Sequence, residues 1–347
     1  MGAKRSKRGR GGQISLQFPD GTLPGEMAFS AAARVDDTLF VADDESASLI
    51  RLSRDGAGWR AVETHALSEY VDLPGGPEDE IDIEGMAVHE GWLWVVGSHA
   101  LVREKPEDGD SPKRALRRIG EINRKANRYM LCRLPLCRQG SGWVLDTEGD
   151  AGMLEAGKRS SVLMRWLSED PLLAPYLSLP SKENGFDIEG IAAGPSGVWL
   201  GLRGPTIRGY AVLLQLDLRG AKHGRLKARK LEGGRRYRKF LLDLGGLAVR
   251  DLIFDGGDLL ILGGATTQAD SPSRIFRWEG AAGAGDSALF GADKVIPLHD
   301  LPFQVGRDAP EALADLEDRQ VLILHDRPAA HRIDRTRGIY SADVICL

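Results

Sequence analysis

Four acidic residues recur at one position of a repeated sequence pattern: Glu84, Glu189, Asp251 and Glu311. The two clearest copies of the pattern begin D-I-E-G-M-A and D-I-E-G-I-A, and each continues through a turn into an apolar strand. Carboxylates that converge on one point can bind a hard cation such as calcium, which takes about 6–8 oxygen ligands, or can transfer protons. The repeat therefore predicts a carboxylate-rich site drawn from distant parts of the chain, with these four residues as metal ligands.

Cationic and imidazole side chains occupy places where they would join this site: Arg203, Arg250, His99 and His325. Two carboxylates about 6 Å apart, at an effective dielectric near 20, repel by roughly 3 kcal/mol. A cluster of four therefore needs protons, cationic side chains or a metal. We expect the arginines to hold an anionic group and one histidine to act as general base. In the alternative interpretation, the acids only cap strand entries or pair internally with the arginines.

Five copies of the pattern can be aligned, and each is predicted to form two strands joined by a Gly- or Asp-containing turn. They span Phe29–Asp44, Asp82–His99, Asp187–Gly204, Arg250–Gly264 and Pro310–Asp326, with Ser30 at the acidic position of the first. Further strands follow each copy, including W-V-L-D-T from Trp143 and L-K-A-R-K-L from Leu226. Four strands per unit around a ring are typical of a β-propeller, an all-β fold. The copies predict five blades, with six as the alternative.

One interval between acidic positions, from Glu84 to Glu189, is much longer than the others and holds either two blades or one blade with insertions. We favour helical insertions at about 103–126 and 150–180. The first has a helix start at Ser111 with Pro112 at the first helical position, and Glu155–Leu167 has helical spacing. The last copy lacks a strand, which Ile14–Phe18 near the N-terminus can supply, so that the ring leaves no open edge.

Composition limits the classes of protein that remain. Among 347 residues, 46 Lys and Arg against 50 Asp and Glu give a net charge of -4, which excludes a uniformly basic nucleic-acid binder. The hydrophobic share of 42% is enough for a large core. No apolar run approaches the roughly 18 residues of a membrane span, and the basic residues 1–12 are followed by no signal-peptide core. We expect a disordered basic tail, then one propeller domain over residues 13–347, in a cytoplasmic protein without membrane contact.

Two basic segments, residues 114–128 and 222–239, lie outside the repeat and are expected to be solvated surface. Clustered Lys and Arg also suit phosphate groups, so a nucleic-acid or other anionic partner stays open. Tyr237 and Phe240 are the aromatic residues close by, which gives little support to base stacking. If the first insertion leans over the site, Arg117 and Arg118 are candidates for binding an anionic substrate.

The D-x-E-G copies, with their G-S-H and G-L-R-G endings, resemble a bacterial family known as domain-of-unknown-function family 3616 over nearly the whole chain. The element is also similar to that of esterase-like phytase domains and of the SdiA-regulated family. These resemblances imply a propeller and, more loosely, a calcium site or hydrolase activity. The first family has no established activity to carry over.

Two functions follow from this reading. The first is a hydrolase, with calcium as the candidate cofactor, that acts on a small ester or phosphoester at the mouth of the propeller channel. The second is a non-catalytic scaffold whose basic insertions contact a protein or anionic partner. An enzyme needs the acids, arginines and histidines within reach of one point, whereas a scaffold needs only an exposed surface.

Overall fold

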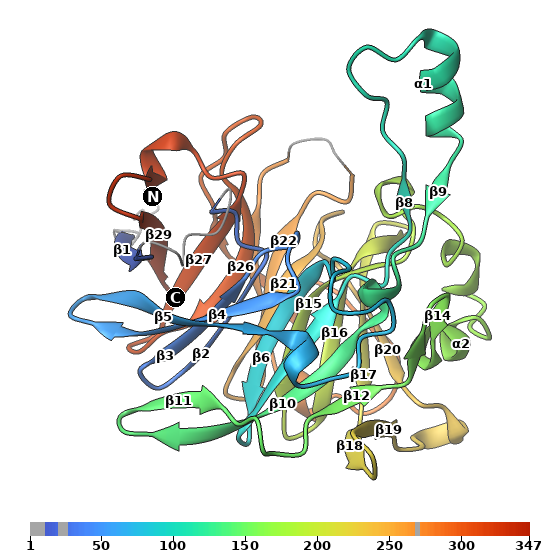
Figure 1. Ribbon diagram of the computed structural model, residues 1–347. Helices are drawn as coiled ribbons and strands as arrows, with labels where there is room; N and C mark the ends of the chain where they lie inside the picture. The colour runs from blue at the N-terminus through green and yellow to red at the C-terminus, as the bar shows by residue number, and fades with distance from the viewer. Residues whose placement is uncertain (1–10, 20–26, 268–270) are drawn as a thin grey trace, which may run out of the picture.

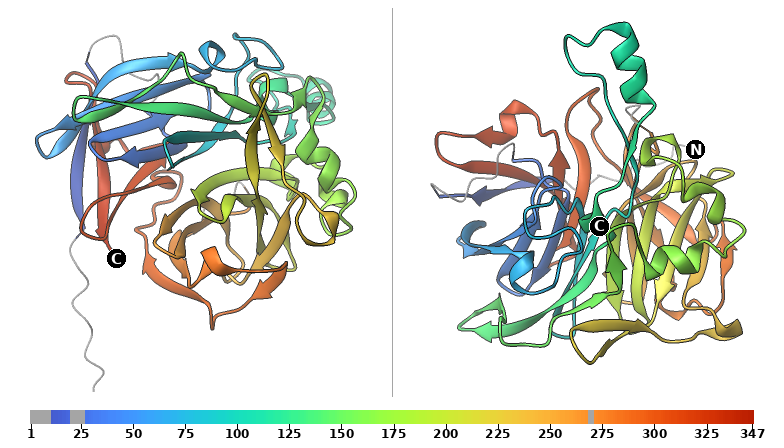
Figure 2. Two further views of the ribbon diagram at one scale, coloured as in Figure 1. Left: turned by 90° about the horizontal axis from the view of Figure 1, so that it is seen from below. Right: turned by 45° about the vertical axis from the view of Figure 1, so that its right-hand side comes forward.

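The computed structural model describes residues 11–19, 27–267 and 271–347, so the first ten residues of the predicted basic tail lie outside the described part. The described strands form mainly antiparallel sheets arranged around a common axis (Figures 1 and 2), which confirms the β-propeller prediction. No helix in the described ranges is long and apolar enough to cross a membrane.

Five groups of four paired strands can be followed from the inside of the ring outward. The first two are β2 (Ala31–Val35), β3 (Thr38–Ala42), β4 (Ser48–Asp55) and β5 (Gly58–Ala66), then β6 (Ile83–His89), β7 (Trp92–Gly97), β10 (Leu131–Gln139) and β12 (Gly152–Leu154). The third is β15 (Asp187–Gly194), β16 (Gly197–Ile207), β17 (Tyr210–Leu216) and β20 (Arg238–Leu242), extended by β24 (Ala288–Phe290). The fourth is β21 (Ala248–Asp255), β22 (Asp258–Gly264), β23 (Arg274–Trp278) and β25 (Val295–Asp300). The fifth is β26 (Ala309–Asp315), β27 (Gln320–Asp326), β29 (Ile339–Cys346) and β1 (Gly12–Gln17).

The ring closes through strands from both ends of the chain. β1 pairs antiparallel with β29, in a register from Gly12 opposite Val344 to Gln17 opposite Ile339. The innermost strands contact one another in the order β2, β6, β15, β21, β26 and back to β2. The N-terminal strand thus completes the last sheet, as its sequence predicted, and covers an edge that would otherwise present unpaired backbone groups.

Large apolar side chains fill the spaces between neighbouring sheets. Between the third and fourth sheets, the Trp199 ring stacks on Phe240 at 5.1 Å and meets Trp278 edge-on at 5.5 Å between centroids. All three side chains are almost fully buried. Such wedges hold the sheets at a fixed angle, so that the inner strands stand close around the axis and can position side chains in the channel.

The interval between Glu84 and Glu189 holds one four-stranded sheet and its insertions. A two-stranded arm, β8 (Val102–Arg103) and β9 (Ile122–Asn123), carries α1 (Pro112–Ile119) away from the ring (Figure 1). The helix α2 (Val162–Leu167) is shorter than the predicted Glu155–Leu167. Residues before it form the hairpin β13 (Ala156–Gly157) and β14 (Ser160–Ser161), and the Ser161 side chain then caps the helix by accepting from the Met164 N–H.

Two outer strands pair differently from the sequence expectation. L-K-A-R-K-L forms β19 (Arg225–Ala228) of a hairpin with β18 (Leu218–Ala221), and β19 joins the second sheet through β12. The fourth strand of the third sheet is β20 instead. The W-V-L-D-T segment forms β11 (Gly142–Leu145), which extends β10 as a separate hairpin, and β28 (Ile333–Asp334) pairs similarly with β29. These peripheral pairings depend on contacts between sheets, which repeat spacing does not encode.

Candidate functional site at the channel mouth

A β-bulge in four of the inner strands turns one side chain into the channel. The pairing register skips one residue in each strand: Glu84 in β6, Glu189 in β15, Arg250 in β21 and Glu311 in β26. Ser30 stands at the equivalent place just before β2. A bulge re-aims a side chain locally. We call these five residues the channel position, and its members are three glutamates, one arginine and one serine.

The register corrects the predicted alignment of Asp251. Arg250, not Asp251, is the bulged residue of β21, and Asp251 takes the next place, where β6 and β15 have Gly85 and Gly190. Its carboxylate accepts from the N–H groups of Leu252 and Leu313, both at 2.7 Å. Asp251 therefore links two neighbouring inner strands and has no place among the converging carboxylates.

The glycines that β6 and β15 carry at the place of Asp251 show how little room a side chain has there. A Cβ built on Gly190 would lie 2.7 Å from the Cα of Asp251, and one on Gly85 would lie 2.9 Å from Ile191. The inner strands are thus in backbone contact here, which explains the glycine in D-x-E-G. The motif combines a residue that faces the channel with one that permits close approach.

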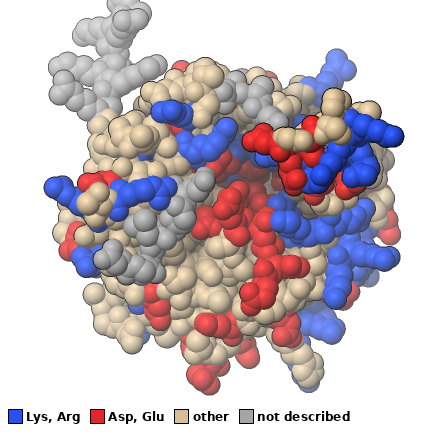
Figure 3. All heavy atoms as spheres, turned by 45° about the horizontal axis from the view of Figure 1, so that its top comes forward, with Lys and Arg blue, Asp and Glu red and all other residues tan. Residues whose placement is uncertain are grey.

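A cavity of about 740 Å³ opens at this end of the channel. Its lining includes four of the five residues at the channel position, namely Ser30, Glu84, Arg250 and Glu311. Acidic side chains gather in the hollow centre of this face, with basic side chains beside them (Figure 3). We call this space the mouth cavity.

Two arginines bind the converging acids together. Arg203 contacts Asp187 and, at 2.5 Å, Glu189. Arg250 lies 3.2 Å from Glu189 and also contacts Glu311. Arg250 thus bridges the two sheets on either side of its own, and both predicted arginines do reach the predicted glutamates.

Glu84 makes no ion pair with a cationic side chain in the described part of the chain. One oxygen each of Glu84, Glu189 and Glu311 lies within 4.8 Å of the others. Burial raises the pKa of Glu84 well above its usual value, and the charges of Glu189, Asp82 and Asp187 raise it further. The Glu84 carboxyl group therefore holds its proton to a higher pH than an ordinary glutamate does.

Replacing Glu84 with glutamine should stabilise the protein increasingly as the pH rises. In the wild type, the proton on folded Glu84 contributes stability at acid pH. This contribution is lost as the pH rises from the ordinary carboxyl pKa through the raised folded value. Each unit of that difference corresponds to about 1.4 kcal/mol, so we expect a gain of roughly 1–3 kcal/mol at pH 8. Urea unfolding between pH 5 and 9 measures it.

Glu90→Gln is the matched control, because Glu90 lies on the turn of the same hairpin with its side chain 80% exposed. Its unfolding free energy should follow that of the wild type across the pH range. A difference between Glu84→Gln and wild type that stays constant from pH 5 to 9 would contradict the buried, protonated state of Glu84.

A second pair of acids, the aspartates of the two D-I-E-G copies, lines the cavity beside the channel position. Asp82 contacts Arg128 at 3.1 Å, and Arg128 also contacts Glu80. Burial raises the pKa of Asp187 to about 7, although Arg203 opposes the rise. A carboxyl group that titrates near neutral pH is suited to general acid–base transfer.

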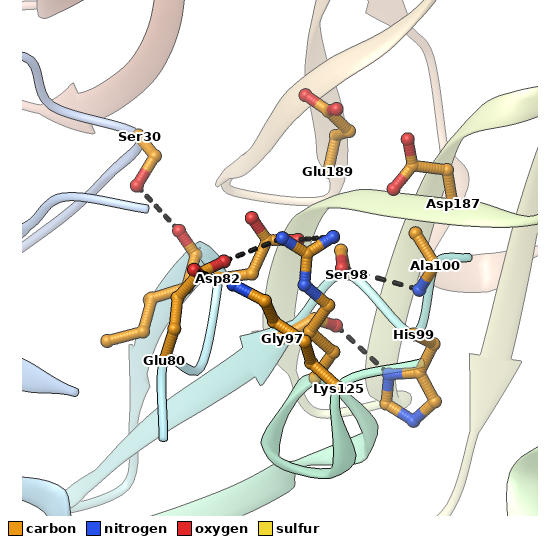
Figure 4. A network of polar contacts seen from close by, with 12 residues as sticks. Ser30, Glu80, Asp82, Gly97, Ser98, His99, Ala100, Lys125, Asp187 and Glu189 are labelled. Atoms are coloured by element: carbon orange, nitrogen blue, oxygen red, sulfur yellow. Dashed lines mark hydrogen bonds and ion pairs between the residues drawn. The ribbon is translucent and has the colours of Figure 1, made fainter. Parts of the chain in front are cut away.

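Neither histidine lies in the lining of the mouth cavity. His99 is buried, with Nδ1 3.0 Å from the Gly97 carbonyl oxygen and its ring edge-on to Tyr129, and it points away from Asp187 and Glu189 (Figure 4). His325 lies inside the fifth sheet, with Nδ1 3.3 Å from the Tyr340 hydroxyl. Burial lowers both pKa values to about 4, so both rings are neutral at pH 7. The order of residues along the chain predicted that both histidines lie near the mouth. His99 instead follows the end of β7 with a positive φ of 56°, and His325 faces Tyr340 and Asp343 of the neighbouring strand β29.

Sequence reasoning gave Arg128 and Lys182 no place in the site, yet both line the mouth cavity. Arg128 belonged to a basic segment expected to be surface, and Lys182 lies in a short 3-10 helix, Ser181–Glu183, just ahead of the third repeat copy. Their proximity comes from chain folding, and the sequence carries no spacing signal for it. By contrast, Arg118 pairs with Glu107 at 2.6 Å and Asp110 at 3.1 Å within the projecting arm, and neither it nor Arg117 lines the cavity.

The mouth residues satisfy the basic requirements of a hard divalent cation. The lining of the mouth cavity together with Glu189 carries nine carboxyl groups against seven Lys and Arg side chains, Lys182 included, which leaves a surplus of two negative charges if every carboxyl group is ionised. Glu311 Oε2 is buried without a hydrogen-bond partner among the described residues. Oxygens up to 4.8 Å apart suit calcium, whose ligands lie at about 2.3–2.6 Å. Two protons can balance the same surplus.

A family model described as "Protein of unknown function (DUF3616)" matches residues 28–343. No curated protein matches the sequence.

Similar solved structures include the Cps50 (Swd1) β-propeller domain of Myceliophteria thermophila, with 10% identity, coverage of 94% of this chain and 98% of that one, and a TM-score of 0.35. Glutaminyl cyclase of Myxococcus xanthus is 9% identical, with coverage of 96% and 99% and a TM-score of 0.41. The PQQ-bound aldose sugar dehydrogenase of Streptomyces coelicolor is 10% identical, with coverage of 96% and 98% and a TM-score of 0.37. At these values the likenesses assign no ligand or reaction to this chain.

Proposed function

The chain belongs to the DUF3616 family of proteins of unknown function, and from its mouth cavity we propose that it is a calcium-dependent hydrolase of a small ester or phosphoester. The observation that carries the proposal is the surplus of two carboxylate charges at the channel position and beside it. A surplus of this kind in a buried site favours a ligand of opposite charge. The cavity is large enough for a small-molecule substrate.

Glu84, Glu189 and Glu311 are the residues that would hold calcium. When bound, calcium supplies Lewis-acid polarisation of the substrate and lowers the pKa of a coordinated water. Arg203 and Arg250 keep Glu189 in one orientation by contacting both of its oxygens. The carboxylates are therefore held in place before any ligand arrives, which reduces the entropy lost on binding.

Asp187 takes the role of general base that the sequence suggested for a histidine. It lines the mouth cavity, and burial raises its pKa to about 7, so the group is about half ionised at neutral pH. Arg203 holds the carboxylate toward Glu189 and stabilises the ionised form. Asp187 can then accept a proton from an attacking water, while Arg128 and Lys182 on the cavity wall can bind an anionic group of the substrate.

The proposal is tested by calcium binding and by hydrolysis. Calorimetry should show saturable binding of Ca²⁺ to the wild type with release of protons, because binding must displace the protons that balance the surplus charge. Glu84→Gln should lose most of this binding. Hydrolysis of p-nitrophenyl acetate or p-nitrophenyl phosphate should require calcium. The rate of hydrolysis should fall at least 100-fold in Asp187→Asn, because this variant lacks the general base. The same variant should still bind calcium.

Glu90→Gln serves again as the control and should keep both properties. Absence of calcium binding in the wild type would overturn the metal site. Calcium binding without hydrolysis of either substrate would leave a structural cation site. In that case the alternative of a non-catalytic scaffold gains weight, and the internal pairing of the acids with Arg203 and Arg250 already favours it.

A further inference from the structure

A second cavity, of about 340 Å³, lies at the opposite end of the propeller from the mouth cavity. It is found between the second and third sheets, where the β6–β7 and β15–β16 turns meet, and the basic hairpin β18–β19 contributes to its wall. We call it the lower cavity. Its charged and aromatic lining consists of His89, Glu90, Trp92, Trp94, Arg133, Asp217, Arg219 and Arg229.

Arg133 is placed in this cavity by contacts that leave its charge without a counter-ion. The guanidinium carbon lies 3.7 Å from the Trp92 ring centroid and 5.8 Å from that of Trp94. Arg133 makes no ion pair within 4.0 Å among the described residues, and its buried Nε has no hydrogen-bond partner there. Asp150 acts on it only as a more distant charge. A partly desolvated guanidinium of this kind favours an anion that can accept several N–H groups.

The other arginines of the lower cavity add positive charge to this point. Arg219 and Arg229 share a single carboxylate, Asp217, each at 3.4 Å. Their side chains are 66% and 62% exposed, so both are free to reorient toward a ligand. Three guanidinium groups against one aspartate leave this wall cationic, and the Glu90 side chain in the same lining is 80% exposed and screened by solvent.

The Arg133 guanidinium lies close against the β18 backbone at Gly220. A Cβ built on Gly220 would lie 2.3 Å from an Arg133 terminal nitrogen. Glycine at this strand position therefore permits the arginine to occupy its place against Trp92. Gly220 does not have a positive φ, so the backbone itself would accept alanine there.

We propose that the lower cavity binds the phosphate group of a small phosphorylated molecule, with Arg133 as its central ligand. The phosphate would receive N–H groups from Arg133 and from Arg219 or Arg229, and the remainder of the molecule would lie along Trp92 and Trp94. The cavity exceeds the size of inorganic phosphate alone, which is why an ester is favoured. A concave site around one stacked arginine fits a compact anion better than an extended nucleic-acid backbone, which needs a row of contacts.

The test uses inorganic phosphate as the probe, with sulfate and chloride at matched ionic strength, and follows binding by calorimetry and tryptophan fluorescence. Wild-type protein should bind phosphate saturably and in preference to chloride. Arg133→Met keeps an apolar side chain on Trp92 without the charge and should weaken binding at least tenfold. Arg138→Met, on an exposed position of the same strand, should bind as the wild type does.

A second variant guards against misfolding of Arg133→Met. Gly220→Ala retains the arginine but displaces its guanidinium, and it should also weaken phosphate binding while the urea midpoint stays near that of the wild type. Failure of the wild type to bind phosphate, or equal binding by Arg133→Met, would overturn the proposal. So would tighter binding of a 20-base-pair DNA that Arg133→Met leaves unchanged, since the basic hairpin would then be a nucleic-acid surface.

Discussion

Replacing Arg250 with methionine should lower the free energy of unfolding by about 3–5 kcal/mol, the effect expected when one partner of a buried ion pair is removed. Arg250 bridges Glu189 and Glu311 from two neighbouring sheets, and its own side chain is only 12% exposed. Without Arg250, the buried carboxylates of Glu189 and Glu311 face each other and that of Glu84. Arg203 is then the arginine that still contacts Glu189. Urea unfolding at pH 7.5 in the presence of a chelator measures the loss.

Two comparisons identify the cause. The double variant Arg250→Met with Glu311→Gln should recover part of the lost stability, because it removes one of the carboxylates that Arg250 neutralised. Arg274→Met is the matched control, since Arg274 pairs with Asp300 in the same sheet but is 41% exposed, and its effect should stay below about 1 kcal/mol. If both single variants lose the same stability, Arg250 has no special role at the channel position.

The closing strand gives the second large effect. Leu16→Asp should destabilise the protein by at least about 4 kcal/mol, because Leu16 is fully buried in the core and the change adds an unpaired buried charge. Loss of β1 pairing would also uncover the edge of β29 and open the ring. Unfolding followed by tryptophan fluorescence, with size-exclusion chromatography to detect edge-to-edge association, checks both consequences.

Ser15→Asp adds the same charge to the same strand on its exposed face and should change the free energy of unfolding by less than about 0.5 kcal/mol. If Leu16→Asp remains monomeric and as stable as this control, β1 is dispensable and the ring is held closed by the remaining contacts between sheets.

The repeat made the propeller predictable because it encodes interactions that are local to each unit. A short strand rich in small residues, a turn with Gly or Asp, and then a continuously apolar strand define a hairpin from neighbouring residues alone. The same logic identified Ile14–Phe18 as the closing strand. It did not extend to the pairing of β19 with β12, because β19 lies along the chain between two strands of the third sheet and yet joins the second sheet.

The charged residues show where sequence comparison was misled. Asp251 aligns with the repeat glutamates as an acid, but the bulge of β21 moves the channel position to Arg250. A one-residue change in register reverses which face a side chain takes. The channel position of β21 therefore carries Arg250, which neutralises Glu189 and Glu311, in place of the predicted carboxylate ligand Asp251. This exchange alters the charge balance of the whole site.

By itself, the sequence determined the all-β repeat, the closing strand and the convergence of Glu84, Glu189 and Glu311, because each depends on a pattern repeated along the chain. Only the tertiary structure decided that Arg250, and not Asp251, takes the channel position, that His99 and His325 are buried away from it, and that Arg128 and Lys182 line the mouth cavity. It also decided that Arg133 stacks on Trp92 in a cavity of its own. The physical reason is that bulge position and packing between sheets set the direction of each side chain, and these depend on contacts between residues far apart in the sequence.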